Sequence, residues 1–211
     1  MTVSHPRVIL KPGVASTPGG TIFWQKFREA AKKKQKRIIF PEGNDPRVLS
    51  AASYLVREGI CVPLLVGKPD TVVSALKNAG FSDKGIEILD PSDLANRETF
   101  AEDLFERRKA KGMTLEQSLV LMEDPLYFSA IALKRGVADG FVGGAVRSTA
   151  DTVRAAFAAL SLAPEADMAF GAFLMECPSV VGPPRCFVSS KFFSQNLAAP
   201  MATAANARGE G

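Results

Sequence analysis

The sequence predicts an α/β fold, in which a mostly parallel β-sheet is flanked by helices in three layers. Three observations support this prediction. Short apolar runs that are typical of buried strands alternate with longer amphipathic segments that are typical of helices. Cap and turn residues separate the two kinds of segment. Of the 211 residues, 46% are hydrophobic and 23% are charged, a composition typical of a globular protein with a sizeable core.

The first strand and the helices on either side of it are marked by local signals. A helix is predicted from residue 21 to about residue 36, and its lysine-rich last turns suit the helix dipole. The apolar run at residues 37–41 predicts a buried strand. Asp45 and Pro46 then match the N-cap and first position of the next helix, which Gly59 ends.

The same alternation continues along the chain. Further strands are predicted at residues 62–67, 86–89, 137–142 and 168–175. Further helices are predicted at residues 70–79, 96–111 and 149–160, with two more beginning at a capping box (Thr114 and Gln117) and at Asp124. After residue 178 the pattern is lost. Residues 185–193 could form a strand, but no amphipathic helix follows it.

These signals divide the chain into four predicted parts. Residues 1–20 are expected to be a flexible N-terminal arm, and residues 21–145 a first α/β domain. Residues 146–178 are expected to hold only the start of a second α/β domain. Residues 179–211 are expected to be a divergent, disordered tail.

Composition excludes several classes of function. No run approaches the roughly 18 apolar residues that cross a membrane, and the N-terminus has no signal-peptide core, so a cytoplasmic protein is expected. The three cysteines have no metal-ligand spacing, and the one histidine lies in the predicted arm, which argues against a metal site and a Ser-His-Asp triad. The lysine run after residue 28 continues an amphipathic helix and is interpreted as a solvated face rather than a nucleic-acid site.

Two segments are candidates for binding an anion. The first is the cationic end of the helix at residues 106–112, which equally suits a solvated helix terminus. In the second, a predicted strand enters the turn around Gly143 and Gly144, and Ser148 and Thr149 open the next helix. Free backbone N–H groups at such a place would receive phosphate, although glycines also serve tight turns. Neither common nucleotide-binding fingerprint is present.

The sequence resembles the phosphate acetyl/butyryl transferase family over about residues 21–178. The matching blocks occur in that family's order. They are I-I-F-P-E-G-N-D-P-R-V-L (38–49), E-G-I (58–60), L-V-G (65–67), G-I-E-I (85–88), D-P (90–91), R-K-A-K-G-M-T (108–114), D-P-L-Y-F (124–128), A-D-G (138–140) and G-A-V-R-S-T-A-D-T-V-R (144–154).

The resemblance implies a phosphate acetyltransferase, an acyltransferase of acetate metabolism that converts acetyl-coenzyme A (acetyl-CoA) and phosphate to acetyl phosphate and CoA. It implies small-molecule substrates, no cofactor or metal, and a possible homodimer, with the site in a cleft between two α/β domains. The arginines of two family motifs fall on Arg108 and Arg154 and are expected to bind CoA, since guanidinium is a rigid phosphate donor. Ser148 and Thr149 are the next expected contacts.

Three departures from the family pattern bear on activity. Arg147 stands where many members have histidine, and Ala155 stands where proline is frequent. The block that supplies the family's catalytic serine, arginine and aspartate has no counterpart, so the catalytic residues are unknown. The expectation is therefore a truncated chain that is inactive alone. The alternative is a non-catalytic CoA- or phosphate-binding module, or a regulatory partner subunit.

Overall fold

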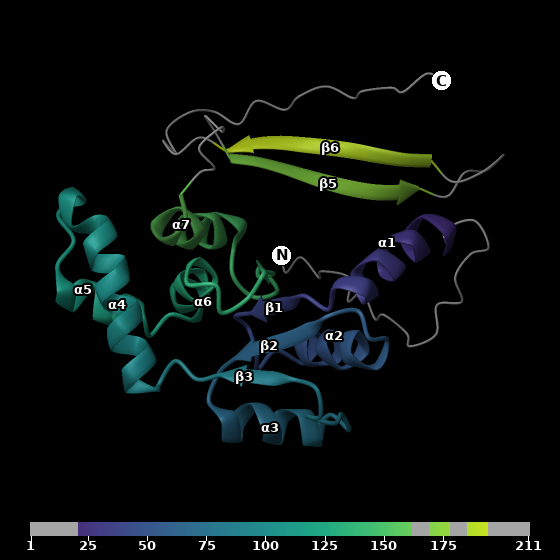
Figure 1. Ribbon diagram of the computed structural model, residues 1–211, viewed down its shortest axis with the longest axis horizontal. Coiled ribbons are helices and arrows are strands. Elements are labelled where there is room, and N and C mark those ends of the chain that lie inside the picture. The colour runs from purple at the N-terminus through teal and green to yellow at the C-terminus, as the bar shows by residue number, and fades with distance from the viewer. Residues whose placement is uncertain (1–20, 162–168, 178–184, 194–211) are drawn as a thin grey trace, which may run out of the picture. The chain divides into compact units, whose positions relative to one another are not determined.

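The computed structural model describes residues 21–161, 169–177 and 185–193 (Figure 1). The predicted N-terminal arm lies outside these residues. Contacts divide the chain into two units, one comprising Arg28–Asp167 and the other comprising Met1–Phe27 and Met168–Gly211. The candidate site residues all belong to Arg28–Asp167.

A parallel sheet forms the centre of the unit Arg28–Asp167. Its strands are β1 (Arg37–Phe40), β2 (Val62–Val66), β3 (Glu87–Leu89) and β4 (Gly140–Phe141), in the order β3-β2-β1-β4. Every neighbouring pair is parallel, and Ile39 of β1 lies opposite Leu64 of β2 and Phe141 of β4. The predicted parallel α/β sheet is confirmed, although β4 is shorter than the strand predicted at residues 137–142.

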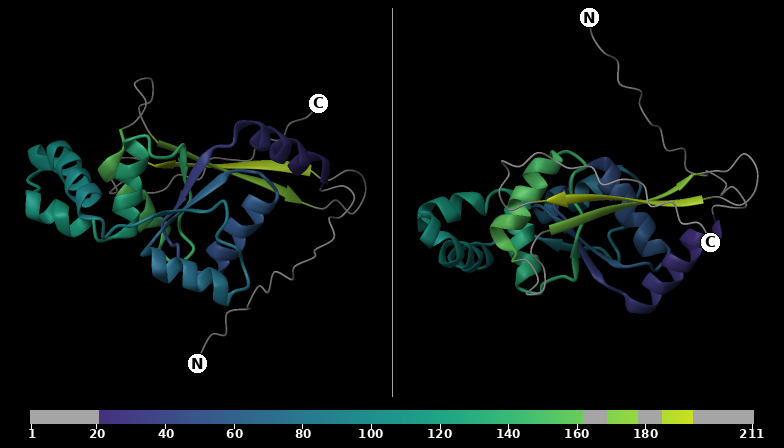
Figure 2. Two further views of the ribbon diagram at one scale, coloured as in Figure 1. Left: turned by 60° about the horizontal axis from the view of Figure 1, so that its bottom comes forward. Right: turned by 90° about the horizontal axis from the view of Figure 1, so that it is seen from above.

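Helices cover both faces of this sheet, because successive strand residues point to opposite sides. Phe40 and Leu65 face α2 (Pro46–Arg57) and α3 (Pro69–Asn78), which lie side by side in Figure 2. Ile39 and Leu64 face the opposite core. Its helices are α4 (Leu94–Arg108), α6 (Pro125–Lys134) and α7 (Thr149–Ala159). The three-layer arrangement predicted from sequence is therefore present.

The helix boundaries follow the predicted cap signals. Asp45 caps α2 by accepting from the backbone N–H of Arg47, and Asp124 caps α6 in the same way. Thr114 and Gln117 form the expected capping box at α5 (Leu115–Leu121), which a 3-10 turn (Lys109–Lys111) and Gly112 separate from α4. The first helix, α1 (Thr21–Lys34), ends earlier than predicted because Gln35 adopts a left-handed φ of 43°.

The later part of the chain holds α7 and a second, small sheet. Because α7 packs against α6 and α4, the unit that contains the first sheet continues past residue 145 to Asp167. In the other unit, β5 (Ala169–Cys177) pairs with β6 (Arg185–Phe193) as a separate antiparallel two-stranded sheet. Residues 185–193 of the expected disordered tail therefore form a strand, while residues 179–184 and 194–211 lie outside the described residues.

Candidate functional site

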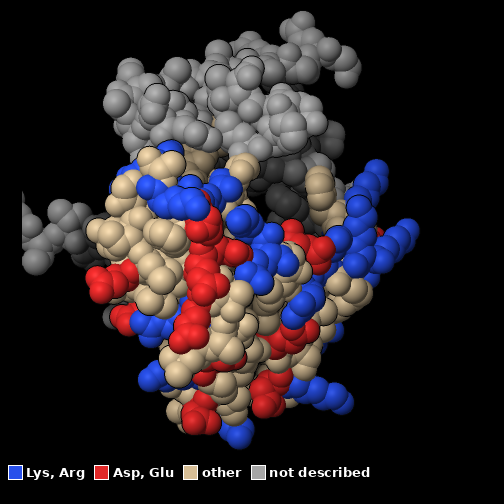
Figure 3. Space-filling view, turned by 60° about the vertical axis from the view of Figure 1, so that its left-hand side comes forward, with Lys and Arg blue, Asp and Glu red and all other residues tan. Residues whose placement is uncertain are grey.

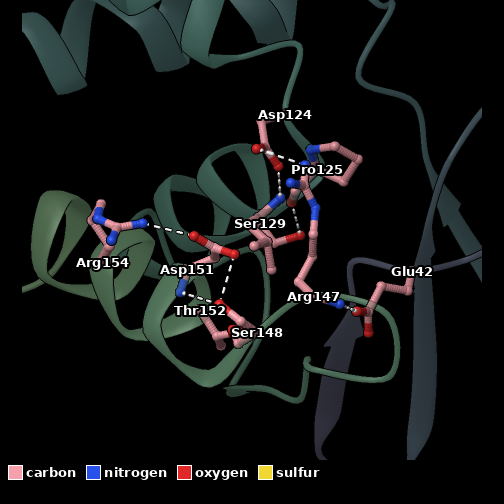
Figure 4. Close-up of polar contacts among 10 residues, drawn as sticks. Glu42, Asp124, Pro125, Ser129, Arg147, Ser148, Asp151, Thr152 and Arg154 are labelled. Atoms are coloured by element: carbon pink, nitrogen blue, oxygen red, sulfur yellow. Dashed lines mark hydrogen bonds and ion pairs between the residues drawn. The ribbon is translucent and has the colours of Figure 1, made fainter. Parts of the chain in front are cut away.

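The turn that follows β4 is built around a carboxylate. The backbone N–H groups of four successive residues converge on the side chain of Glu42, and Figure 4 shows the contact with the last of them, Arg147. Gly144 and Ala145 donate to Oε2 at 3.1 and 2.8 Å, and Val146 and Arg147 donate to Oε1 at 2.7 and 2.9 Å. Gly144 permits this curvature with a φ of 103°. We refer to these four N–H groups as the backbone nest.

The nest corrects the expectation that this turn offers free N–H groups to phosphate. It is an anion-binding arrangement, but its anion is the chain's own carboxylate. Partial burial alone would raise the pKa of the Glu42 carboxyl, yet the four N–H hydrogen bonds outweigh burial and hold the pKa below its ordinary value. In the sequence Glu42 lies within the family-like block at residues 38–49, and no local pattern there indicates a contact with residues 144–147.

The first turn of α2, just after the loop that follows β1, holds the same turn at a second point. The guanidinium of Arg47 donates to the carbonyl oxygen of Ala145 at 2.5 Å and pairs with Asp45 through two hydrogen bonds of 2.9 and 2.8 Å. Only glycine fits at position 43 of this loop, because a Cβ atom there would lie 2.5 Å from the carbonyl oxygen of Val66. Both loops leave the carboxyl ends of β1 and β4, where strand order reverses and open α/β sheets usually bind ligands.

The first turn of α7 is capped locally. The Ser148 hydroxyl accepts from the backbone N–H of Asp151 at 3.1 Å and donates to its carboxylate at 2.7 Å. The hydrogen bond from Ser148, followed by that from Arg154, lowers the pKa of Asp151. The structure thus gives Ser148 a capping role. Thr149 is the exposed first residue of α7.

The two arginines carried over from the family motifs occupy different environments. Arg154 projects from α7 with its side chain 54% exposed and pairs with Asp151 at 2.7 Å, one helical turn away. Such an exposed ion pair adds little to the stability of the fold, so the fold does not depend on the position of the Arg154 guanidinium. Arg108 ends α4 and donates to the carbonyl oxygens of Phe157 and Ala158 at 2.9 and 3.3 Å. It thereby satisfies acceptors at the C-terminal end of α7.

Arg108 and Arg154, although far apart in sequence, line the same hollow of about 280 Å³. The remaining lining residues come from the 3-10 turn and its exit, from α5 and from the helices α6 and α7: Lys111, Gly112, Met113, Gln117, Leu121, Tyr127 and Ala158. We call this the arginine hollow. Three of its residues are cations, which suits a ligand bearing negative charge. Ser148 and Thr149 do not line it.

Sequence reasoning found only part of the hollow. In the sequence, Lys111 is part of a cationic run. Gln117 is part of a helix capping box, and Tyr127 is part of a family-like block. No signal in the sequence indicated that these side chains meet. Figure 3 views this end of the unit, where Lys and Arg side chains are interspersed with Asp and Glu side chains. The cations of the hollow are therefore distinguished by their shared cavity and not by a uniformly basic surface.

Metal-binding clusters and membrane-spanning helices are both absent from the described residues. None of the described histidine, cysteine, aspartate and glutamate side chains gather in a group of three that could hold a metal ion. No helix in the described ranges is long and apolar enough to cross a membrane.

Comparison with known proteins gives consistent matches. Residues 22–198 match the family model of the phosphate acetyl/butaryl transferases. The phosphate acetyltransferase of Thermoanaerobacterium thermosaccharolyticum is 39% identical over 155 residues, which are 74% of this chain and 47% of that protein. That of Clostridium acetobutylicum is 39% identical over 71% of this chain and 45% of that protein. The chain thus spans about half the length of these curated relatives.

Solved structures agree with these matches. A phosphotransacetylase from Streptococcus pyogenes superimposes with a TM-score of 0.70 at 34% identity, covering 77% of this chain and 49% of that one. The EutD phosphotransacetylase from Staphylococcus aureus gives a TM-score of 0.66 at 27% identity. The family match ends at residue 198, beyond the limit near residue 178 expected from sequence blocks. The resemblance therefore includes the region of β6.

Proposed function

The chain belongs to the phosphate acetyl/butyryl transferase family, and from this premise we propose that it serves the reversible transfer of an acetyl group between CoA and inorganic phosphate. In this reaction the CoA thiol loses its proton and attacks the acetyl carbon of acetyl phosphate. A carbon–sulfur bond forms, the bond from the acetyl carbon to the phosphate oxygen breaks, and phosphate leaves with the balance of one proton. The part of the reaction that we assign to the described residues is recognition of CoA.

The arginine hollow is the observation that carries this proposal. CoA bears several phosphates, and guanidinium groups bind phosphate through paired, charge-assisted hydrogen bonds. The accessible side chain of Arg154 and the neighbouring Arg108 and Lys111 present positive charge to one cavity. Met113 and Tyr127 add apolar contact surface beside these charges.

The size of the hollow indicates how CoA would bind. Sites that enclose a drug-sized ligand measure about 300–1,000 Å³, so a hollow of about 280 Å³ takes only part of CoA. We assign a phosphate-bearing end to the hollow. Ser148 lies six residues before Arg154 in α7, or roughly 9 Å along the helix. An extended ligand could thus also reach Ser148 and Thr149, which we propose as secondary contacts.

Titration calorimetry with CoA tests this assignment. We expect wild-type protein to bind CoA, and Arg154→Ala to weaken binding by roughly 1–3 kcal/mol, the scale of a hydrogen bond to a charged group. Arg57→Ala is the matched control, because Arg57 is an exposed helical arginine with a local acidic partner and lies outside the arginine hollow. Equal affinities of the two variants would refute the role of Arg154.

Further features of the proposal come from the family. We propose that binding needs no metal or other cofactor, that the protein acts in the cytoplasm, and that it forms a homodimer. Calorimetry with and without a chelator tests whether a metal is needed, since CoA affinity should not change. Light scattering coupled to size-exclusion chromatography tests whether the protein is a homodimer.

A further inference from the structure

We propose that Glu42 is a positioning residue whose carboxylate, seated in the backbone nest, holds α7 and with it Arg154 at the arginine hollow. The consequence for CoA rests on the proposed function, whereas the positioning of α7 does not. Glu42 does not line the hollow, so any influence on ligand must pass through α7.

The contacts of Glu42 are those of a bound anion. Both carboxylate oxygens accept two backbone N–H groups each, at 2.7–3.1 Å, from residues more than 100 positions away in sequence. Hydrogen bonds to a charged group are about twice as strong as neutral ones. Without the carboxylate, these four neighbouring N–H groups would lose their shared charged acceptor and would have to turn to water.

The nest leads directly into α7. Arg147 is its last member, and the next residue, Ser148, is the N-cap of the helix. The Arg147 side chain pairs with Asp124, the N-cap of α6, at 2.9 Å. Arg47 holds the carbonyl of Ala145 from the other side. The turn before α7 is thus held at its N–H groups, at a carbonyl and at a side chain, and the N–H contacts are the most numerous.

A cavity experiment separates this role from an ordinary stabilising contact. Glu42→Ala removes the carboxylate and one methylene, which is the size of acetate. We expect acetate to raise the melting temperature of Glu42→Ala saturably, relative to chloride at equal ionic strength, and to restore hydrogen-exchange protection at residues 144–154. Wild type and Glu58→Ala, which lacks a glutamate that pairs with Arg57 outside the nest, should show neither effect.

CoA titration then tests the consequence for the hollow. At a temperature where every variant is folded, we expect Glu42→Ala to bind CoA about tenfold more weakly, within the loss expected for a charged contact. Acetate should restore this affinity. Glu42→Gln fills the same space with an amide that accepts fewer N–H groups. We expect Glu42→Gln to bind CoA more weakly than wild type does, and acetate should not restore its affinity. If Glu42→Ala does not fold, Glu42→Gln still measures how loss of the carboxylate affects CoA binding.

The outcomes distinguish the two proposals. Unchanged exchange in α7 and no specific acetate effect would overturn the role of Glu42. So would CoA affinity that falls in Glu42→Ala but is not restored by acetate. If wild type does not bind CoA, the proposed function fails, and the exchange and acetate measurements still decide whether Glu42 positions α7.

Discussion

Glu42 and Arg154 are both charged residues, yet their partners differ in kind. Glu42 has four backbone donors that its removal would leave without an acceptor. Arg154 has a single side-chain partner on the same helix, in an exposed pair that its removal would barely disturb. We therefore expect substitution of Glu42 to affect stability, and substitution of Arg154 to affect ligand binding with little change in stability.

The lowered pKa of Glu42 makes part of the stability depend on pH. Because the folded-state pKa lies below the unfolded value of about 4.3, the ionised carboxylate stabilises the fold above that value, and this contribution is lost as the pH falls through the folded pKa. We expect the difference in unfolding free energy between wild type and Glu42→Gln to be largest near pH 7 and to shrink at acid pH.

Urea denaturation at a series of pH values measures this difference. Glu58→Gln controls for the loss of a glutamate carboxylate outside the backbone nest. A gap between wild type and Glu42→Gln that widens as the pH falls would contradict the assigned direction of the Glu42 pKa.

At the scale of elements, α7 is held mainly by its surroundings. An isolated helix of 11 residues is marginal in water. Here the nest and Ser148 hold its beginning, Arg107 and Arg108 bind carbonyl oxygens at its end, and Ala155 and Ala159 are fully buried against neighbouring helices. Arg108 therefore both stabilises the end of α7 and lines the hollow. Arg108→Ala would change stability together with CoA binding, so Arg154→Ala is the clearer test of CoA binding.

The capping box of α5 provides a second test at this scale. Thr114→Ala removes the acceptor for the Gln117 backbone N–H, and loss of such a cap costs about 0.5–2 kcal/mol of stability. Because Gln117 and Leu121 of α5 line the hollow, we also expect weaker CoA binding. Urea unfolding and calorimetry measure the two effects.

Thr71→Ala is the matched control for the cap. Thr71 is an exposed threonine in the first turn of α3, outside the hollow, so its substitution should change stability by less than about 0.5 kcal/mol. Equal destabilisation by the two variants would show that the capping box makes no special contribution.

At the scale of the whole molecule, we expect binding without turnover from this 211-residue chain. Acetyl transfer needs a base for the thiol and donors for the developing oxyanion. The family resemblance assigns those groups to a block that was not recognised in this sequence. Loss of a single oxyanion donor costs about a hundred- to a thousand-fold in rate, so acetyl-CoA formation should not exceed background.

The assay follows thioester absorbance after acetyl phosphate and CoA are mixed with the purified chain. Arg154→Ala serves as a control for contaminating activity, which would be the same in both preparations. Turnover by wild type that Arg154→Ala abolishes would contradict the prediction.

Features that depend on neighbours along the chain could be predicted before the fold was known. Strand and helix alternation, the caps at Asp45, Thr114 and Asp124, and the parallel sheet were all predictable, because apolar periodicity and cap hydrogen bonds act within a few residues. The family resemblance also located Arg108 and Arg154, but it could not say what surrounds them.

Only the tertiary structure decided which distant groups meet. It placed Glu42 in the turn after β4, so an expected phosphate site proved to be filled internally. It joined Arg108 and Arg154 in one hollow but left Ser148 and Thr149 outside it. It also paired β5 with β6. These outcomes depend on strand order and helix packing, which bring together residues from separate segments. Local sequence patterns do not predict which segments will meet.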